Sequence, residues 1–435
     1  MPGYSGVPKT FRRYVPEQAL LLPPSLSDWV PEGHLARFVS DVVDELDLSK
    51  IESSYEEERG FPPYNPRMMT KLLVYAYATG TYSSRRIAGK LVDSVAFRFL
   101  AAGNAPDFRT ICRFRKIHGE ALDGLFVQVL HLCQHAGLVK MGKVAVDGTK
   151  IKANASKHKA MSYDRMTERE RAIKDEVRRI LEEAGRIDEE EDELYGKDRR
   201  GDELPEELQT REGRLKKIRE AKAALEAEAR EQARAAGKDP KKAKPEPSAQ
   251  RNFTDPESRI QKTSDGFIQG YNAQIAVDGH AQVIVAHQVA QASSDVAHLV
   301  PLIQAAGETL GQKPKQVLAD AGYWSESNVW EMRKSDIDPY IPPGRMKHSD
   351  ARTPAPRGRK PRQMSFKARM ERKLRTVRGR AIYAWRKILP EPVFGQIKQA
   401  RGFRQFLRRG VRAVREEWSL LCTVHNLLKL YAATV

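Results

Sequence analysis

A highly charged segment, residues 160–250, stands between two stretches that have the pattern of β-strands. Before it, β-branched residues alternate in KVAVDGTKIKANAS from position 143, with a strand expected to end near Asp147 and to resume past Gly148. After it, strand character returns over residues 270–290. The pattern predicts one sheet domain, interrupted by two long helices that fold back on each other. The residues that step by four and three along these helices are Ile173, Val177, Ile180, Ala184 and Ile187, then Leu208, Leu215, Ile218 and Leu225.

Two stretches inside the insertion have a different composition. Residues 196–205, GKDRRGDELP, break the helical pattern, and the Lys- and Pro-rich residues 237–248 cannot pack a core. We expect the first to be the turn between the two helices and the second to be a linker that leads back to the sheet.

The chain before the sheet has the apolar spacing of helices over residues 32–138. Three short helices follow one another there: one capped by Ser83 or Ser84, one over residues 95–100, and one over residues 108–118 that Pro106-Asp107 opens. Such a tandem resembles a helix-turn-helix unit.

The third of these helices has two different faces. Arg109, Arg113 and Lys116 are spaced to lie together on one of them. This basic face is either a DNA-docking surface or a solvated face of a core helix, and both readings stay open. The residues expected towards the other face are Ile111, Phe114 and Ile117.

The part after the insertion alternates strands and helices. A hairpin is expected to turn at residues 277–279, and Ser294 or Asp295 to cap the helix that follows. Residues 316–319 and 338–343 have the apolar character of short strands. This order predicts an α/β layer with a mixed sheet.

The charge of the chain indicates a polyanionic partner. Its 435 residues include 75 Lys and Arg against 57 Asp and Glu, which gives a net charge of +18. A field of that sign attracts nucleic acid, and an anionic membrane surface is the weaker alternative because no basic amphipathic anchor stands out. Residues 357–380 alone hold eleven Lys or Arg against one acid. Such a run is either a disordered basic arm or a phosphate-binding segment.

We expect the protein to stay in the cytoplasm of the cell that makes it. Cys112, Cys133 and Cys422 are far apart and form no close pair typical of a disulfide framework or a zinc knuckle. The apolar run over residues 19–22 is too short for a secretory signal or a membrane span. The length of the chain fits two or three domains.

Three acids meet the requirements of phosphodiester cleavage. Two divalent metals about 3.5 to 4 Å apart generate a bound hydroxide and clamp the attacking and leaving oxygens, and carboxylates are ligands that magnesium prefers. Asp147 and Asp320 each end an apolar strand next to small residues, and Glu391 falls in the first turn of a helix that Pro390 opens. Each acid alone has a structural alternative, since Asp-Gly and Asp-Ala-Gly are ordinary turn sequences and a first-turn Glu pairs with the helix dipole.

Three separated motifs, VAVDGTKIKANAS, VLADAGYWS and EPVFGQIKQARGFRQFLRRG, occur in that order, with the charged helical segment between the first strand and the hairpin. They resemble those of the DDE transposases of bacterial insertion sequences, in the branch whose last motif carries Tyr, Arg, Glu and Lys. The likeness extends to the helical N-terminus with its LLPPSLSDWVPEGHLARFV segment. It implies a ribonuclease-H-like catalytic core, a magnesium-dependent triad of acids and recognition of the element's terminal inverted repeats.

The resemblance places the triad on Asp147, Asp320 and Glu391. These residues would be both the catalytic acids and the ligands of Mg²⁺. Two ions are expected, and Mn²⁺ is expected to substitute for Mg²⁺ because both are hard divalent ions. Asn272 and Gln274 belong to a strand typical of the family, and the sequence gives them no role beyond hydrogen bonding.

The resemblance also places the last motif's remaining residues on Tyr383, Arg386 and Lys398, which are expected to hold DNA phosphate near the cleaved end. Four residues separate Arg386 from Glu391, where the usual pattern has three. Tyr383 has a plain core position as its alternative. Trp324 is either a stacking platform for an unstacked base or an aromatic that caps the core.

These features together predict a DNA transposase. Residues 1–138 would form an all-α DNA-binding domain and residues 139–435 a ribonuclease-H-like α/β catalytic domain, interrupted by the helical hairpin and linker of residues 160–250. The protein would hydrolyse a phosphodiester at each end of its element and join the freed 3′ hydroxyls to target DNA.

The predicted partners are double-stranded DNA and, because two ends must be held together, a second copy in at least a homodimer. No membrane and no small-molecule substrate are expected, and the location would be cytoplasmic and nucleoid-associated. Two other functions stay open: an architectural DNA-binding protein that has lost catalysis, and a nuclease of the same fold without strand transfer.

Overall fold

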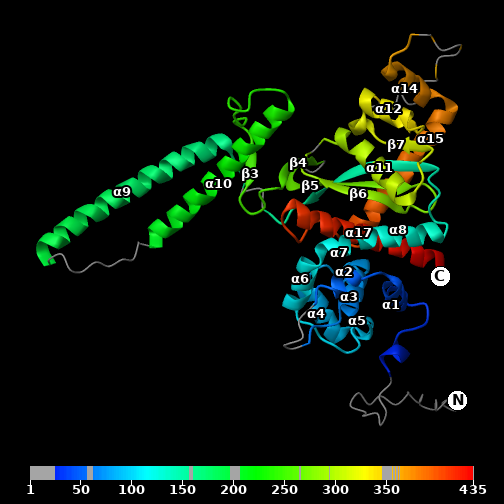
Figure 1. Ribbon diagram of the computed structural model, residues 1–435, viewed down its shortest axis with the longest axis horizontal. Helices are drawn as coiled ribbons and strands as arrows, with labels where there is room; N and C mark the ends of the chain where they lie inside the picture. Colours follow the sequence, from blue (N-terminus) through cyan, green and yellow to red (C-terminus); the bar gives the residue numbers. More distant parts are fainter. Residues whose placement is uncertain are drawn as a thin grey trace, which may run out of the picture.

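The computed structural model describes residues 25–55, 62–155, 160–195, 206–263, 266–292, 294–344 and 363–434, with residues 355, 358 and 361. For 180–195 and 206–212 it describes the backbone alone. The apolar run at 19–22 and the predicted turn at 196–205 lie outside the described residues. The described chain forms a helical region, a sheet region and a hairpin that stands away from both (Figure 1).

The helical N-terminal region is confirmed, since helices and loops account for the described residues between 26 and 135. Asn65 caps one of its longer helices, because its side-chain oxygen accepts the first free N–H groups at Arg67 and Met68. The elements are η1 (Leu26–Trp29), α1 (Leu35–Glu45), α2 (Ser49–Glu52), α3 (Pro66–Ala78), α4 (Ser84–Asp93), α5 (Val95–Leu100), α6 (Phe108–Ile117), α7 (Gly119–Asp123) and α8 (Leu125–His135).

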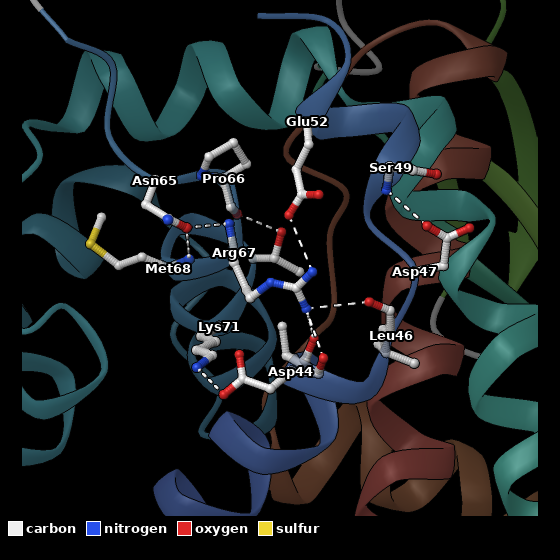
Figure 2. Close-up of polar contacts among 12 residues, drawn as sticks. Asp44, Leu46, Asp47, Ser49, Glu52, Asn65, Pro66, Arg67, Met68 and Lys71 are labelled. Atoms are coloured by element: carbon white, nitrogen blue, oxygen red, sulfur yellow. Dashed lines mark hydrogen bonds and ion pairs between the residues drawn. The ribbon is translucent and has the colours of Figure 1, made fainter.

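Arg67 of α3 fastens α1 and α2 to its own helix (Figure 2). Its guanidinium donates to the backbone carbonyls of Val43 and Asp44, both at 2.9 Å, at the end of α1. It also pairs with Glu52 of α2 at 3.2 Å, while Lys71 pairs with Asp44 at 2.6 Å. The last carbonyls of a helix have no partner within the helix, so Arg67 satisfies groups that would otherwise need water.

The three short helices predicted in tandem are present as α4, α5 and α6. The predicted start of α6 is confirmed, because Asp107 is its N-cap and accepts a hydrogen bond from the Thr110 N–H at 2.6 Å. Ser83 holds the N-cap position of α4 but makes no capping bond. Ser84, the first residue of α4, instead accepts a hydrogen bond from Arg115 at 3.3 Å.

A six-stranded mixed sheet lies at the centre of the second region, as predicted, in the order β4-β5-β1-β7-β8 with β6 also paired to β5. β1 is antiparallel to β5 and parallel to β7, and β7 is parallel to β8. The predicted hairpin is formed by β5 and β6. The strands are β1 (Lys143–Lys152), β4 (Arg259–Thr263), β5 (Gly266–Asp278), β6 (Ile284–Ala290), β7 (Gln316–Leu318) and β8 (Asp338–Tyr340).

The prediction that the first strand ends near Asp147 is wrong. β1 continues without a break, and Asp147 and Gly148 pair with Ile275 and Gln274 of β5. Gly148 does not make a turn. A Cβ atom there would clash with the side-chain amide of Gln274 and lie 3.1 Å from Oδ1 of Asn272. Glycine is required because two side chains of β5 cross over β1 at this point.

The prediction that Ser294 or Asp295 caps the next helix is confirmed for the position alone. Asp295 holds the N-cap position of η3 (Val296–His298), which leads into α11 (Leu299–Leu310) with His298 at the N-cap position of the latter. Asp295 makes no capping bond, because its carboxylate accepts hydrogen bonds from Asn272 and Gln274 instead.

The insertion is a helical hairpin, as predicted, and Figure 1 shows it projecting from the sheet region. β2 and β3 pair antiparallel at its base, and the two helices share a small apolar core of their own. Of the predicted stepping residues, Ile173, Leu215, Ile218 and Leu225 are buried there, while the side chains of Ile180, Ala184, Ile187 and Leu208 lie outside the described residues. The elements are β2 (Ala160–Ser162), α9 (Tyr163–Tyr195), α10 (Glu206–Ala235) and β3 (Gln250–Asn252).

The last helix joins the helical region to the sheet. α17 (Val411–Thr434) contacts α3, α7, α8 and β6. On the sheet side, Asn426 exchanges two hydrogen bonds of 2.8 Å with the backbone of Ile284. One continuous set of buried side chains therefore runs through both regions. In the parts of the chain that are described, no helix is long and apolar enough to cross a membrane.

A buried carboxylate stands at this junction. Glu417 of α17 accepts hydrogen bonds from the backbone N–H groups of Leu407 and Arg408, at 3.0 and 3.1 Å, and from the Tyr77 hydroxyl at 3.3 Å. Arg115 of α6 donates to the same hydroxyl at 3.0 Å. Burial raises the pKa of Glu417, and the positive charge of Arg115 opposes that effect.

The remaining elements follow the sheet. Met370 and Leu374 of α14 are buried, so part of the basic run 357–380 packs against the protein rather than forming an arm. The elements are η4 (Ala321–Tyr323), α12 (Glu326–Lys334), α14 (Phe366–Arg375), α15 (Val377–Ile388), α16 (Pro390–Gly395) and the π-helical turn η5 (Gln396–Ala400).

Candidate active site

Asp147 of β1 and Asp320 after β7 lie at the same level of the sheet. β1 and β7 are parallel neighbours, with Ala145 opposite Leu318, and each aspartate stands two residues further along its own segment. β7 ends before Asp320 while β1 continues through Asp147, and the parallel register brings the two residues close together. Asp320 caps η4, and its Oδ1 accepts the N–H of Gly322 at 2.8 Å.

Glu391 approaches these aspartates from α16. Pro390 stands at the start of this helix, as predicted, and puts Glu391 in the first turn. Val393, Phe394 and Ile397 are buried and fix the helix against the sheet region, as expected from the sequence. The side chain of Glu391 is 53% exposed, whereas that of Asp147 is 17% exposed. The site thus has one sheltered and one open carboxylate.

Arg386 lies between these two carboxylates. It comes from the end of α15 and places one guanidinium nitrogen 3.8 Å from Asp147 Oδ2 and another 3.4 Å from Glu391 Oε1. The extra residue between Arg386 and Glu391 therefore does not prevent the contact. A guanidinium that binds two carboxylates can bind phosphate oxygens in the same forked manner.

Asp147 carries the electrostatic signature of a crowded acidic site. Burial, with smaller contributions from the negative charges of Asp320 and Glu391, raises the pKa of Asp147 to about 6. A hydrogen bond from the Gly148 N–H and the charge of Arg386 oppose this effect. Carboxylates that repel one another in a sheltered place favour a bound cation or a proton.

Lys398 and Tyr383 complete the group around Asp147. Lys398 Nζ donates to the Thr149 hydroxyl and, at 3.2 Å, to the Lys150 carbonyl. Burial lowers the pKa of Lys398, the charge of Arg404 lowers it further, and the charge of Asp147 opposes both.

Tyr383 of α15 packs in part against the core, which agrees with its structural alternative. Burial raises the pKa of its hydroxyl to about 12, and the charges of Asp320 and Asp147 contribute. The hydroxyl of Tyr383 therefore lies in the field of Arg386, Asp320 and Asp147, and its core packing does not remove it from the site.

The donor atoms of the site fit a hard divalent cation. Asp147, Asp320 and Glu391 offer carboxylate oxygens alone, which is the donor set that Mg²⁺ and Mn²⁺ bind. Among the described residues, however, no three His, Cys, Asp or Glu side chains are close enough together to hold a metal as they stand. The guanidinium of Arg386 lies between two of the acids. The carboxylate donors suit a hard divalent cation, and the three side chains would have to move closer together to bind it.

The predicted basic face of α6 is exposed. Arg109, Arg113 and Lys116 face solvent, while Ile111 and Phe114 are buried. The prediction for Ile117 is wrong: it is the last residue of α6, where the apolar face no longer meets the core, and it is 57% exposed. Figure 1 shows α6 in the helical region, apart from β1 and β7.

An exposed aromatic side chain lies beside this face. Phe108 opens α6, and the guanidinium groups of Arg85 and Arg109 lie 5.1 and 5.6 Å from the centre of its ring. Arg85 belongs to α4, so the surface spans two helices of the tandem. Basic side chains interleaved with an aromatic ring are typical of nucleic-acid surfaces.

Trp324 and the basic run have partly structural positions. Trp324 follows η4 and packs in part against the core. Within the run, Lys373 pairs with Asp338 at 2.5 Å and lies over the ring of Tyr340. Lys373 is therefore engaged with β8 and Arg372 donates to the Gly358 carbonyl, whereas Arg369 on the same helix α14 is exposed.

The sequence analysis missed a second cluster beside the acids. Asp295 lies 3.6 Å from Lys150 Nζ and accepts hydrogen bonds from Asn272 and Gln274, both at 2.7 Å. Tyr323 donates to the other end of the Gln274 amide. The available signal was the pair of polar residues at alternate positions of an otherwise apolar strand, since buried amides need partners.

Two family models match the chain. One, described as Transposase domain (DUF772), matches residues 24–117, and the other, described as Transposase DDE domain, matches residues 239–427. Asp320 and Glu391 lie inside the second match, and Asp147 lies between the two. No curated protein and no solved structure matches the chain significantly. Both matched domains are transposase domains, and the chain is therefore a DDE transposase of an insertion sequence.

Proposed function

We propose that this transposase binds the terminal inverted repeats of its insertion sequence, hydrolyses a phosphodiester at each end, and joins the freed 3′ hydroxyls to target DNA. The observation that carries the proposal is that Arg386 pairs with both Asp147 of β1 and Glu391 of α16, while Asp320, after the neighbouring strand β7, acts on Asp147 through its negative charge. Carboxylates and phosphate-binding cations in one place are what hydrolysis of a phosphodiester requires.

The three acids would hold Mg²⁺, with Mn²⁺ as a substitute and two ions in the complete site. When bound, the metal supplies a nucleophile from water and stabilises charge on the transferring phosphate. Asp147 is sheltered and already repelled by its neighbours, so it gains most from a cation. Glu391 is exposed and stands on the first turn of a short helix, so it is the acid that can adjust its position as the site closes.

Arg386, Lys398 and Tyr383 would hold the DNA end against the acids. Arg386 would exchange its carboxylates for phosphate oxygens, and Lys398, fixed by the Thr149 hydroxyl, would supply a second positive charge. The order Tyr383, Arg386, Glu391 and Lys398 around one site supports placing the chain in the branch that carries these four residue types.

We assign residues 1–138 to DNA binding and residues 139–435 to a ribonuclease-H-like catalytic domain, with residues 160–250 as its insertion. The surface formed by Arg109, Arg113 and Lys116 beside Phe108 supports the first assignment. The mixed sheet, whose neighbouring strands β1 and β7 bring Asp147 and Asp320 together, supports the second. Two copies would hold the two ends, and the DNA would keep the protein in the cytoplasm at the nucleoid.

The test uses labelled duplexes made from the DNA that flanks this gene, with Mg²⁺ or Mn²⁺. Wild-type protein should give nicked and joined products, and Asp147→Ala, Asp320→Ala and Glu391→Ala should give neither while still binding the duplex. Glu326→Ala, an exposed acid on α12, is the matched control and should cut normally. Binding without cutting in either metal would favour an architectural protein, and cutting without joining would favour a simple nuclease.

A further inference from the structure

Lys150 approaches the acids from the face of β1 opposite to Arg386. Successive side chains of a strand point to opposite faces, so Asp147 and Thr149 share the face that carries Arg386 and Lys398. Lys150 takes the other face, together with Gly148. There its Nζ lies 3.6 Å from Asp295 Oδ1, and the two side chains are 19% and 23% exposed.

Two buried amides hold Asp295 in place. Asn272 and Gln274 of β5 are fully buried, and each donates to Asp295 Oδ1 at 2.7 Å. Tyr323 in turn donates to the carbonyl oxygen of the Gln274 amide, which fixes the direction of its N–H groups. Asp295 is therefore held by side chains from the sheet rather than by the helix that follows it.

Two glycines make room for this arrangement. A Cβ atom at Gly148 would lie 2.9 Å from the Gln274 Cδ, and one at Gly322 would lie 3.2 Å from Asp295 Oδ2 and 3.0 Å from Asp320 Oδ1. The carboxylates of Asp295 and Asp320 therefore both lie close to Gly322, which has no side chain to push them apart. Gly148 directly follows Asp147, and Gly322 lies two residues after Asp320.

The ion pair between Lys150 and Asp295 is expected to add little to the free energy of unfolding. A partly exposed pair contributes little to folding, and removing two charges from water opposes it. The charges of Asp320 and Asp147 also act on Lys150, so its ammonium lies in the field of two triad acids. Burial lowers the pKa of Lys150, and these three carboxylates oppose that effect.

We propose that Lys150 contacts a phosphate of the DNA end in the active site, and that Asp295 is the positioning residue that aims it. The inference rests on the proposed function. In this arrangement, positively charged side chains meet the transferring DNA end from both faces of β1. Arg386 and Lys398 lie on one face, and Lys150 lies on the other. A compact ammonium held by a fixed carboxylate is suited to a single phosphate oxygen.

The first experiment measures how the affinity of the full-length protein for the end duplex depends on salt. Each phosphate contact contributes a slope of about 0.9 in log affinity against log salt, so Lys150→Gln should lower the slope by roughly that amount. Lys150→Arg should restore it, because a charge remains. Lys313→Gln, an exposed lysine before β7, is the control and should leave the slope unchanged. An unchanged slope in Lys150→Gln overturns the proposal.

The second experiment combines the two substitutions in the cleavage assay. Asp295→Asn keeps the oxygen that accepts both amides and removes the charge that holds Lys150. If Asp295 acts through Lys150, the double variant Lys150→Gln/Asp295→Asn should cleave as fast as Lys150→Gln alone. If the fold-loss of cleavage rate in the double variant equals the product of the two single losses, Asp295 does not position Lys150. A wild-type protein that binds but never cuts would count against the proposed function, while the salt slope would still decide whether Lys150 meets phosphate.

Discussion

Replacing Gly148 by alanine should damage the site through packing, without removing any functional group. The new Cβ would clash with the Gln274 amide and lie 2.9 Å from its Cδ and 3.1 Å from Asn272 Oδ1. Carbon atoms rest at about 3.5 to 4.0 Å, so the amide must move by roughly 0.5 to 1 Å. Its 2.7 Å hydrogen bond to Asp295 then lengthens beyond the range of a good bond.

The expected loss of stability follows from these contacts. Overpacking a filled interior costs about 1 to 3 kcal/mol, and a hydrogen bond to a charged group contributes about 1.5 to 3 kcal/mol. The two effects describe the same displacement, so we expect Gly148→Ala to lower the free energy of unfolding by about 2 to 3 kcal/mol. If β1 moves instead of Gln274, Asp147 shifts with it, and cleavage falls for that reason.

Thermal and denaturant unfolding of Gly148→Ala, beside the cleavage assay, checks this reasoning. Gly142→Ala is the matched control, since a Cβ at Gly142, just before β1, would meet nothing within 4 Å. The control should melt and cut like the wild type. A Gly148→Ala protein as stable and as active as the control would refute the claim that the Asp-Gly sequence serves close packing.

Three further predictions concern the helical region and its junction with the sheet. Asp107→Ala removes the side-chain cap of α6 and should lower the free energy of unfolding by about 0.5 to 2 kcal/mol, measured by denaturant unfolding. Gly89→Ala, in the exposed interior of α4 where a Cβ meets nothing within 4 Å, should raise it by about 0.5 to 1 kcal/mol in the same measurement; a loss would mean that the helix needs glycine there. Glu417→Gln should flatten the pH dependence of the melting temperature. Burial raises the pKa of Glu417 above its usual 4.5, so the folded state binds the proton more tightly and the contribution of this residue to stability falls as pH rises from about 4.5. A pH profile identical to that of the wild type would contradict this role.

Much of the architecture could be predicted because it depends on local pattern. Apolar spacing is sufficient to predict helices such as α6 and the hairpin of β5 and β6, and Pro390 marks the start of α16. The family followed from separated motifs in one order. The two aspartates could be paired from the sequence because each follows a short run of apolar residues, although the run before Asp147 is only the first part of β1.

The errors arose where a distant contact decides the local structure. Asp147-Gly148 is a dipeptide common in turns, but here the chain continues as a strand because β5 pairs with both residues. Aspartate commonly caps helices, but the carboxylate of Asp295 accepts hydrogen bonds from the amides of Asn272 and Gln274 instead. Such contacts join residues more than twenty positions apart in the sequence, and no local pattern shows them.

The central claim is that Asp147, Asp320 and Glu391 form one divalent-metal site. Binding of Mn²⁺ to the complex of protein and end duplex, followed by electron paramagnetic resonance, tests it without relying on catalysis. If these acids form the site, wild-type protein binds the ion and Asp147→Asn, Asp320→Asn and Glu391→Gln each weaken binding by more than about tenfold, while Glu326→Gln has no effect. Equal binding by the wild type and all three variants would show that the three acids do not hold the ion.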